Sequence, residues 1–497
     1  MPQRYPFERI RHFYIFTYMA EESLKQKTKK GLYWTFLNQL ANNGLTFVVG
    51  VIMARILSPS DYGITALPVV FIAIAEIFVS GGFGAAMIRK QELTNADLST
   101  AFYYSASVGV LCCIILFFSA PYIAVFYNQP VLTSLVRVTA LTFLLMPLGT
   151  PQDIILKRKL DFKTPTRISV TARVVGSVVG ISCAYLGYGL WSLVVMSIVS
   201  SLLTLILTWI VVRWLPTERW SSESFKYLWN FGNKLMASAL IDKIYSNITP
   251  VIVGKFFSVA ELGVYNRANS YASLPALQGT SVIQQVTFPV LSKMQDDDEN
   301  LARGYRKMLK MSAFVIFPVM MLLAALAKPF IVILVTEKWI DAVLLLQLLC
   351  FSMMWYPIHA INLSLLQVKG RSDLFLKLEI WKKVLGLTVM ACTLPFGLVY
   401  FVAAGIVSSF ISLFINTYYT GKLINVGFLI QMKDLMPIYL LSIFVYVVVM
   451  VVSLFFDNLW LQLFVGGATG AILYMGIAIC CKFSELQDVK YMLNRKV

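Results

Sequence analysis

The sequence predicts an all-α polytopic membrane protein, and three observations lead to this class: its composition, the spacing of its apolar segments and an internal repeat. Of 497 residues, 58% are hydrophobic and 13% are charged, whereas soluble domains are about 45–50% apolar and about 25% charged. Apolar segments recur from Gly31 to Cys481 and leave no stretch long enough for a soluble domain. We therefore expect the function to reside in the membrane part of the chain.

Transmembrane helices can be counted because about 20 apolar residues cross the roughly 30 Å hydrocarbon layer. Counting predicts about fourteen spans, and the basic loops fall at every second connection, which places both termini in the cytoplasm. Met19 offers a second plausible start, so we expect residues 1–18 to be poorly ordered or absent. The expected spans are 31–56, 64–88, 101–125, 134–156, 168–187, 189–212, 230–256, 264–292, 308–335, 343–367, 375–396, 398–420, 437–456 and 459–481.

An internal repeat indicates how these helices are grouped. Residues 55–63 reappear at 255–263, an offset of 200, with a cation, a serine, an acid and a glycine in register. Each half has an even number of spans, so the halves have the same orientation, as in transporters built from parallel repeats. The predicted parts are a basic cytoplasmic segment (1–30), an N-lobe of six helices (31–213), a cytoplasmic linker (214–229), a C-lobe of six helices (230–421), two extra helices (422–481) and a cytoplasmic tail (482–497), with a central cavity between the lobes.

Charged residues inside spans are the candidates for function, because each costs at least about 2.5–3.5 kcal/mol on insertion and needs a partner or a wet cavity. Asn38 and Asn42 join them, because with Thr35 and Thr46 they recur at three- and four-residue steps and line one helix face. Cations near a cavity would bind an anionic head group, and buried acids would bind a coupling ion. The candidate cations are Arg55, Arg173, Lys243, Lys255, Lys382 and Lys383, and the candidate coupling acids are Glu76, Asp242 and Glu379.

Each candidate also has a structural interpretation. The polar stripe could equally serve helix packing, because Asn, Ser and Thr hydrogen-bond between membrane helices. Asp242 and Lys243 could compensate one another, and Glu76 could be a hydrogen-bonded structural glutamate. Arg173 and the 382–383 pair could extend to the membrane interface and bind no substrate.

Several function classes lack material in this sequence. Two histidines, His12 and His359, and seven cysteines in apolar surroundings offer no metal-ligand spacing, and no phosphate-binding G-x-x-x-x-G-K-[ST] run occurs. The net charge of +17 is scattered over short loops, which does not favour nucleic-acid binding. We expect no cofactor, no metal and no enzymatic activity, with energy coming from a proton or sodium gradient or from the substrate's own gradient.

Four stretches carry a resemblance to a known family: Leu24 to Trp34, Ala54 to Gly63, Phe288 to Asp297, and Lys338-Trp339. They resemble the Wzx-type polysaccharide and lipopolysaccharide flippases of the multidrug/oligosaccharidyl-lipid/polysaccharide exporter superfamily, within it the colanic-acid-exporter-like group. The resemblance implies two six-helix lobes in a V around a cationic cavity, two further helices, and an undecaprenyl-diphosphate-linked oligosaccharide as substrate.

The expected function is therefore alternating-access transport of that lipid-linked sugar to the periplasmic leaflet during surface polysaccharide assembly. The partners would be the lipid-linked oligosaccharide, membrane lipids and polysaccharide polymerase or other assembly proteins. Two alternatives stay open: a drug or metabolite antiporter of the same superfamily, which should rely on interior acids and aromatics, and a polysaccharide polymerase or ligase, which should carry a sizeable outward loop.

Overall fold

The structure, a computed structural model, describes residues 7–486, with side chains at residue 31 and at 33–486 except 286. Within that range helices follow one another without an intervening strand, which confirms the all-α class. Eleven spans of this described part are long and apolar enough to cross a membrane. Of the segment expected to be poorly ordered, residues 1–6 lie outside the described range, and the chain is helical from Phe7 onward.

All fourteen predicted spans fall on helices, and eleven of them meet the length and hydropathy of a membrane span. The other three are more polar, because each carries charged or amide side chains. The number fourteen is consistent with this structure and stays a prediction. These three expected spans are 230–256, 264–292 and 375–396.

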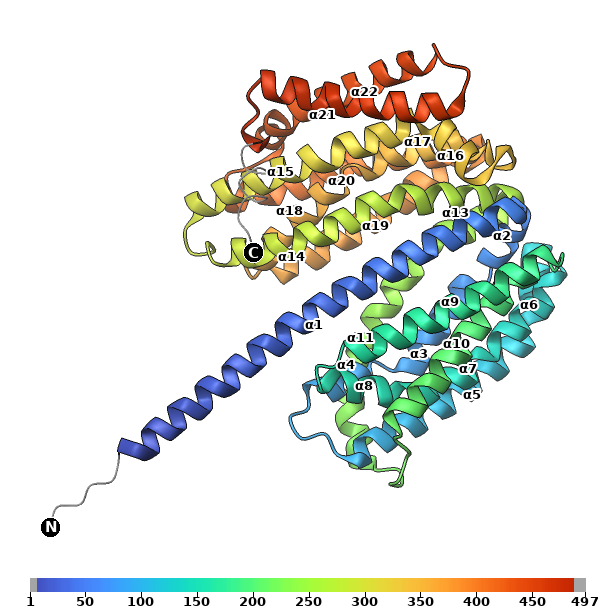
Figure 1. The fold of residues 1–497 in the computed structure, drawn as a ribbon, viewed down its shortest axis with the longest axis vertical. Helices are drawn as coiled ribbons and strands as arrows, with labels where there is room; N and C mark the ends of the chain where they lie inside the picture. The colour runs from blue at the N-terminus through green and yellow to red at the C-terminus, as the bar shows by residue number, and fades with distance from the viewer. Residues whose placement is uncertain (1–6, 487–497) are drawn as a thin grey trace. The chain divides into compact units, whose positions relative to one another are not determined.

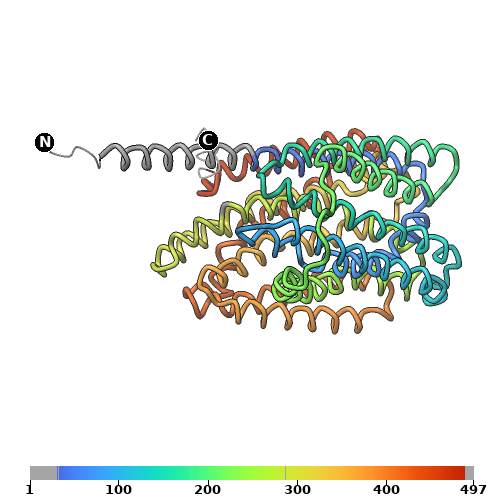
Figure 2. Tube along the Cα trace, turned by 90° about the horizontal axis from the view of Figure 1, so that it is seen from below, coloured from blue at the N-terminus to red at the C-terminus, as the bar shows by residue number. Residues whose placement is uncertain are grey.

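The contacts divide the chain into two compact units, Met1–Val251 and Ile252–Val497. The helices of the first unit are drawn in blue to green in Figure 1 and run side by side in Figures 1 and 2. They are α1 (Phe7–Ile56), α2 (Pro59–Ala66), α3 (Val69–Ser80), α4 (Phe83–Arg89), α5 (Asn95–Tyr127), α6 (Val131–Ala140), α7 (Thr142–Leu145), η1 (Met146–Gly149), α8 (Thr150–Arg158), α9 (Lys163–Tyr185), α10 (Trp191–Val212) and α11 (Ser222–Ser246), and α12 (Ile248–Phe256) contains the boundary.

The second unit holds the remaining helices, yellow-green to red in Figure 1. The two predicted extra helices, α21 and α22, belong to this unit. The predicted lobe boundaries of 213 and 230 stay a prediction. The helices are α13 (Val259–Ser273), η2 (Leu274–Gln278), α14 (Gly279–Ser292), α15 (Asp298–Ala325), α16 (Ala327–Val335), η3 (Glu337–Trp339), α17 (Ala342–Met353), α18 (Tyr356–Val368), α19 (Ser372–Thr393), η4 (Leu394–Phe396), α20 (Leu398–Ile424), α21 (Phe428–Ser453) and α22 (Leu459–Cys480).

The repeat seen in the sequence has a matching local structure. The helices α1 and α12 end at Ile56 and Phe256, and in each case a serine two residues later starts the next helix. Ser58 forms a capping box with Asp61, and Ser258 forms one with Glu261, so that each side chain satisfies a backbone N–H of the other residue. The two serines have nearly the same backbone angles, with φ of −85° and −73°. The 200-residue offset therefore marks the same chain reversal twice.

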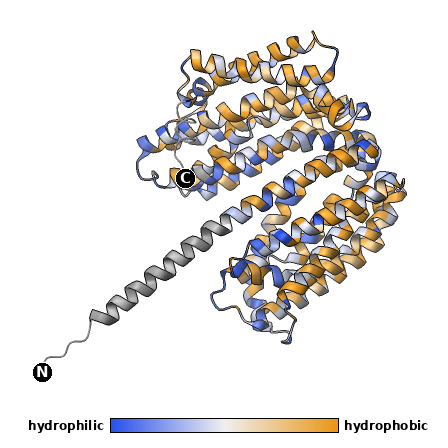
Figure 3. Cartoon of the chain, viewed as in Figure 1, coloured by the Kyte–Doolittle hydropathy of each residue, from blue (hydrophilic) through white to orange (hydrophobic). Residues whose placement is uncertain are grey.

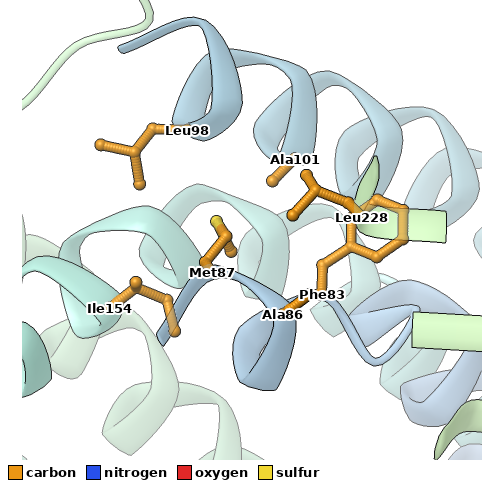
Figure 4. Packing of buried hydrophobic residues seen from close by; sticks show 7 residues of the cluster. All are labelled: Phe83, Ala86, Met87, Leu98, Ala101, Ile154 and Leu228. Carbon is orange, nitrogen blue, oxygen red and sulfur yellow. The ribbon is translucent and has the colours of Figure 1, made fainter. Parts of the chain in front are cut away.

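The second predicted span is not one helix, because it is interrupted between α3 and α4. Gly81 and Gly82 have φ of 55° and 70°, the left-handed region that favours glycine. There the backbone of α11 approaches closely, since a Cβ on Gly82 would lie 2.4 Å from the Gly232 carbonyl oxygen. A buried apolar cluster from α4, α5, α8 and α11 packs next to this contact (Figure 4). It consists of Phe83, Ala86, Met87, Leu98, Ala101, Ile154 and Leu228.

Helices α9 and α10 form the most extensive pair in the first unit, owing to small residues on α9. A Cβ on Gly176 would meet the Ser200 hydroxyl at 2.0 Å and the Met196 carbonyl oxygen at 2.9 Å, and one on Gly180 would meet Met196 Cβ at 2.6 Å. The four-residue spacing of these glycines lets membrane helices approach to backbone contact. The position of the α9 backbone is therefore fixed by α10.

In the second unit α21 is joined to the rest by buried polar contacts. The Arg306 guanidinium donates two hydrogen bonds to the Asp434 carboxylate, at 2.6 and 2.7 Å, and Asp434 is buried. Nearby, the amides of Asn362 and Gln431 donate to one another. The opposite face of α21 is apolar and exposed, and hydrophobic residues dominate α21 and α22 in Figure 3. That exposed face carries Leu440, Phe444, Val447 and Val451, a surface for lipid.

Candidate functional site

The polar stripe of α1 lies along α9 in the first unit. Ser169 of α9 donates to the Asn38 side-chain oxygen at 3.1 Å, and the Asn42 amide donates to the Ser169 hydroxyl at 3.5 Å. One turn further, Arg173 Nη1 donates to the Thr46 hydroxyl at 2.7 Å. The Asn38–Asn42 part of the stripe thus joins α1 to α9. At the Thr46 end both Thr46 and Arg173 are exposed, so this end of the stripe presents a cation. Binding of substrate by Asn38 and Asn42 stays a prediction.

Glu76 and Lys243 carry opposite charges that lie close enough to interact, although the two residues are more than 160 positions apart in the sequence. Glu76 lies on α3 and Lys243 on α11, two helices that pack together in the first unit, and the two charges are within Coulombic range. Both side chains are exposed, as is the neighbouring Asp242. The structure therefore brings a predicted coupling acid and a predicted substrate-binding cation together.

A second group of candidates lies on α19 in the second unit. Lys382 and Glu379 form an ion pair of 2.5 Å, one turn apart, and Lys383 follows on the adjacent strip of the helix. Two residues of α18 complete the group, since Tyr356 is within electrostatic range of Glu379 and His359 of Lys382. His359 is held by Ser409 and Asn416 of α20, at 3.0 and 3.3 Å. The acid is thus partnered by a lysine in this conformation.

Arg55 and Lys255 occupy equivalent places in the two halves. Each lies in the last turn of its helix, three residues before the serine that caps the next one. Both side chains are exposed at that end. Their equivalence follows from the duplicated chain reversal, and their proposed contact with substrate stays a prediction.

Comparison with known proteins shows to which family this chain belongs. A family described as "Polysaccharide biosynthesis protein" matches residues 52–344, more than half of the chain. The chain belongs to this family. Among its relatives is "Teichuronic acid biosynthesis protein TuaB" of Bacillus subtilis, 25% identical over 470 residues that cover 92% of this chain and 96% of that protein.

Two further relatives carry names that refer to polysaccharides. "Lipopolysaccharide biosynthesis protein WzxC" of Escherichia coli is 25% identical and covers 73% of this chain and 74% of its own length. "Succinoglycan biosynthesis transport protein ExoT" of Rhizobium meliloti is 27% identical and covers 64% of this chain and 65% of its own. The predicted resemblance to polysaccharide exporters is confirmed.

Solved structures give the fold of this polysaccharide biosynthesis family member. "Lipid II flippase MurJ, inward closed conformation" matches with a TM-score of 0.73 at 14% identity, covering 91% of this chain and 98% of that chain. An inward-facing multidrug-resistance MATE transporter matches with a TM-score of 0.59 at 15% identity, covering 77% and 95%. The predicted helical transporter architecture is confirmed.

Sequence reasoning missed two intramembrane arginines. Arg267 of α13 is buried and lies over the rings of Tyr271 and Trp339, at 5.7 and 5.3 Å. Arg137 of α6 lies over the Phe117 ring at 4.6 Å. The rule that selected Arg173, a charge inside a predicted span, would have found both. Their aromatic partners point to cation–π contacts.

The charged side chains within the spans suit the binding of an anion. Among the described residues no group of His, Cys, Asp and Glu is arranged to hold a metal ion. The intramembrane cations differ in their partners: Lys382 has an acid, Lys243 lies near one, and Arg173 has the neutral hydroxyl of Thr46. Of these three, Arg173 is the one bound to an uncharged group, which leaves most of its donors for an anion.

Proposed function

We propose that this protein is a flippase that moves an undecaprenyl-diphosphate-linked oligosaccharide from the cytoplasmic to the periplasmic leaflet by alternating access. The observation that carries the proposal is Arg173, an exposed arginine within a membrane span whose hydrogen-bond partner is a neutral hydroxyl. The family and the names of its relatives support a role in surface polysaccharide assembly.

A diphosphate suits these cations for chemical reasons. The guanidinium offers five N–H donors in a planar fork that matches phosphate oxygens, and a lysine adds a point charge. Arg173 uses one donor on Thr46, and Lys243 lies near Glu76 in the same unit. A bound diphosphate would compete with Glu76 for Lys243, so that substrate binding changes the charge around a candidate coupling acid.

We propose that a proton or a sodium ion drives the transport cycle. A carboxylate that loses its neighbouring cation to the substrate is stabilised by taking up a proton or a sodium ion. Glu76, which lies near Lys243, and Glu379, which pairs with Lys382, are the acids that we propose for this exchange. We propose an inner-membrane location with both termini in the cytoplasm, and contact with a polysaccharide polymerase on the periplasmic side.

The decisive experiment is disruption of the gene, followed by extraction of lipid-linked intermediates. Undecaprenyl-linked oligosaccharide should accumulate on the cytoplasmic face, and the wild-type gene should clear it. The Arg173→Ala variant should fail to clear it at equal expression. Accumulation of unlinked sugar nucleotides would contradict the proposal, because it would place the block at an enzyme upstream of transport.

A further inference from the structure

Helix α9 presents Arg173 from a backbone that is packed closely against α10. Gly176, three residues further along, contacts the Met196 carbonyl and the Ser200 side chain of α10 so closely that no Cβ fits between them. The orientation of the guanidinium therefore depends on the long side chain of Arg173 alone. A flexible side chain loses entropy when a ligand orders it, which weakens binding unless another group holds it beforehand.

Thr46 of α1 is the group that holds it. Its hydroxyl accepts a hydrogen bond from Arg173 Nη1 at 2.7 Å and donates one to the Asn42 carbonyl oxygen at 2.7 Å. The single hydroxyl proton is thus committed to the Asn42 carbonyl, which leaves a lone pair for the arginine. Both bonds are of ordinary length, and the threonine satisfies them without charge.

We propose that Thr46 is a positioning residue for Arg173, fixing the guanidinium so that its remaining donors bind the substrate diphosphate. This inference rests on the proposed flippase function. An acid in place of Thr46 would neutralise the arginine, whereas a hydroxyl orients it and leaves its charge for the substrate. The polar stripe of α1 then has two roles, with Asn38 and Asn42 joined to Ser169 and Thr46 serving the cation.

The test uses the full chain in proteoliposomes with a fluorescent polyprenyl-diphosphate-linked disaccharide as the probe. The Thr46→Val variant keeps the shape of the side chain and removes the acceptor, and Thr46→Ser keeps the hydroxyl. Thr166→Val is the control, because Thr166 is a threonine of α9 about two turns from Arg173, and its hydroxyl donates to the Phe162 carbonyl oxygen at 2.6 Å with a longer contact of 3.4 Å to the Trp34 carbonyl oxygen of α1.

The expected result is a half-saturating probe concentration raised about three- to thirtyfold in Thr46→Val, with a maximal rate close to wild type. Thr46→Ser and Thr166→Val should match the wild type. In an Arg173→Ala background, Thr46→Val should add no further loss, because its effect is transmitted through the arginine.

The outcomes separate the two proposals. If Arg173→Ala loses transport while Thr46→Val matches the wild type, the positioning role is wrong and the binding site remains. If Arg173→Ala transports normally, the proposed site itself is wrong. If Thr46→Val, Thr46→Ser and Thr166→Val are all impaired alike, Thr46 contributes helix packing only, which also overturns the inference.

Discussion

Arg137 Nε donates a hydrogen bond of 3.4 Å to the carbonyl oxygen of Phe117, on the neighbouring helix α5. Phe117 lies four residues before Pro121, which has no N–H to donate to that carbonyl. The arginine therefore supplies the hydrogen bond that the proline omits. Its guanidinium also lies over the Phe117 ring, so both contacts hold α6 against the irregular turn of α5.

We predict that Arg137→Ala destabilises the protein by about 1–3 kcal/mol, because a carbonyl inside a membrane span loses its partner. In a Pro121→Ala background the same change should cost less, since the N–H of residue 121 can bond Phe117. Thermal unfolding in detergent of the four members of this double-mutant cycle measures the difference. Equal losses in both backgrounds would contradict the compensation.

We predict that exchanging the charges of Glu76 and Lys243 is better tolerated than reversing either one. Glu76→Lys or Lys243→Glu alone places two like charges near one another, which costs energy inside a span. The double exchange restores attraction and should recover folded protein, measured by size-exclusion chromatography in detergent. Transport should stay impaired in the double variant, because the cation has left α11. A double variant that folds no better than the single ones would show that the two charges do not interact.

We predict that Glu379→Gln impairs gradient-driven transport more than equilibration of the probe between leaflets. Glu379 is partnered by Lys382 at 2.5 Å, and its neutral analogue cannot exchange a proton or a cation. The measurement is uptake in proteoliposomes with and without an imposed proton or sodium gradient. The control is Asp373→Asn, because Asp373 also pairs with a cation, Arg371, but lies at the start of α19 and outside the group. Equal stimulation of Glu379→Gln and wild type by the gradient would remove Glu379 from coupling.

We predict that Gly82→Ala prevents stable folding, whereas Gly44→Ala does not. At Gly82 the backbone has φ of 70° and an added Cβ would lie 2.4 Å from the Gly232 carbonyl oxygen, a clash with backbone that cannot rotate away as a side chain could. Strain of this kind costs about 1–3 kcal/mol, and overpacking adds a similar amount. At Gly44 an added Cβ meets nothing within 4 Å. Yields of monodisperse protein from matched expression cultures compare the two.

We predict that Asp434→Ala destabilises the second unit far more than Asp153→Ala destabilises the first. Asp434 is buried and accepts two hydrogen bonds from Arg306. Asp153, in contrast, pairs with Lys157 one turn away on a partly exposed helix face. Exposed pairs contribute about 0.3–0.5 kcal/mol, and loss of a buried partner costs about 3–5 kcal/mol, less here because Arg306 is partly exposed. Detergent melting temperatures test this, and equal shifts would show that α21 is held by other contacts.

The sequence predicted the positions of the helices well, because membrane spans are set by length and hydropathy. It identified the repeated motif around Ser58 and Ser258, and the structure shows that this motif is a capping box, a local feature of four consecutive residues. It did not predict the interruption at Gly81, because the predicted span 64–88 continues through α3 and α4. That break depends on the backbone of α11, which lies about 150 residues further along the chain.

At the candidate site, too, the sequence predicted the local features and not the contacts between distant helices. Rules for charges inside spans selected Arg173, Lys382 and Glu379 from the sequence, and the structure shows their partners. The electrostatic interaction of Glu76 with Lys243 and the hydrogen bond of Arg173 with Thr46 each join helices that are far apart in the sequence. No spacing rule along one helix contains that information. Arg137 lies inside the predicted span 134–156 and the same rule would have selected it, but its contact with the Phe117 carbonyl oxygen of α5 cannot be predicted from the sequence of α6.

The glycine contact between α9 and α10 has a mechanical consequence. Met196 and Ser200 pack against Gly176 and Gly180 so closely that no Cβ fits between the helices, and we expect α9 and α10 to move together. Any displacement of Arg173 during a transport cycle is then a displacement of both helices. A spectroscopic label on α10, away from substrate, would report the movement of the cation.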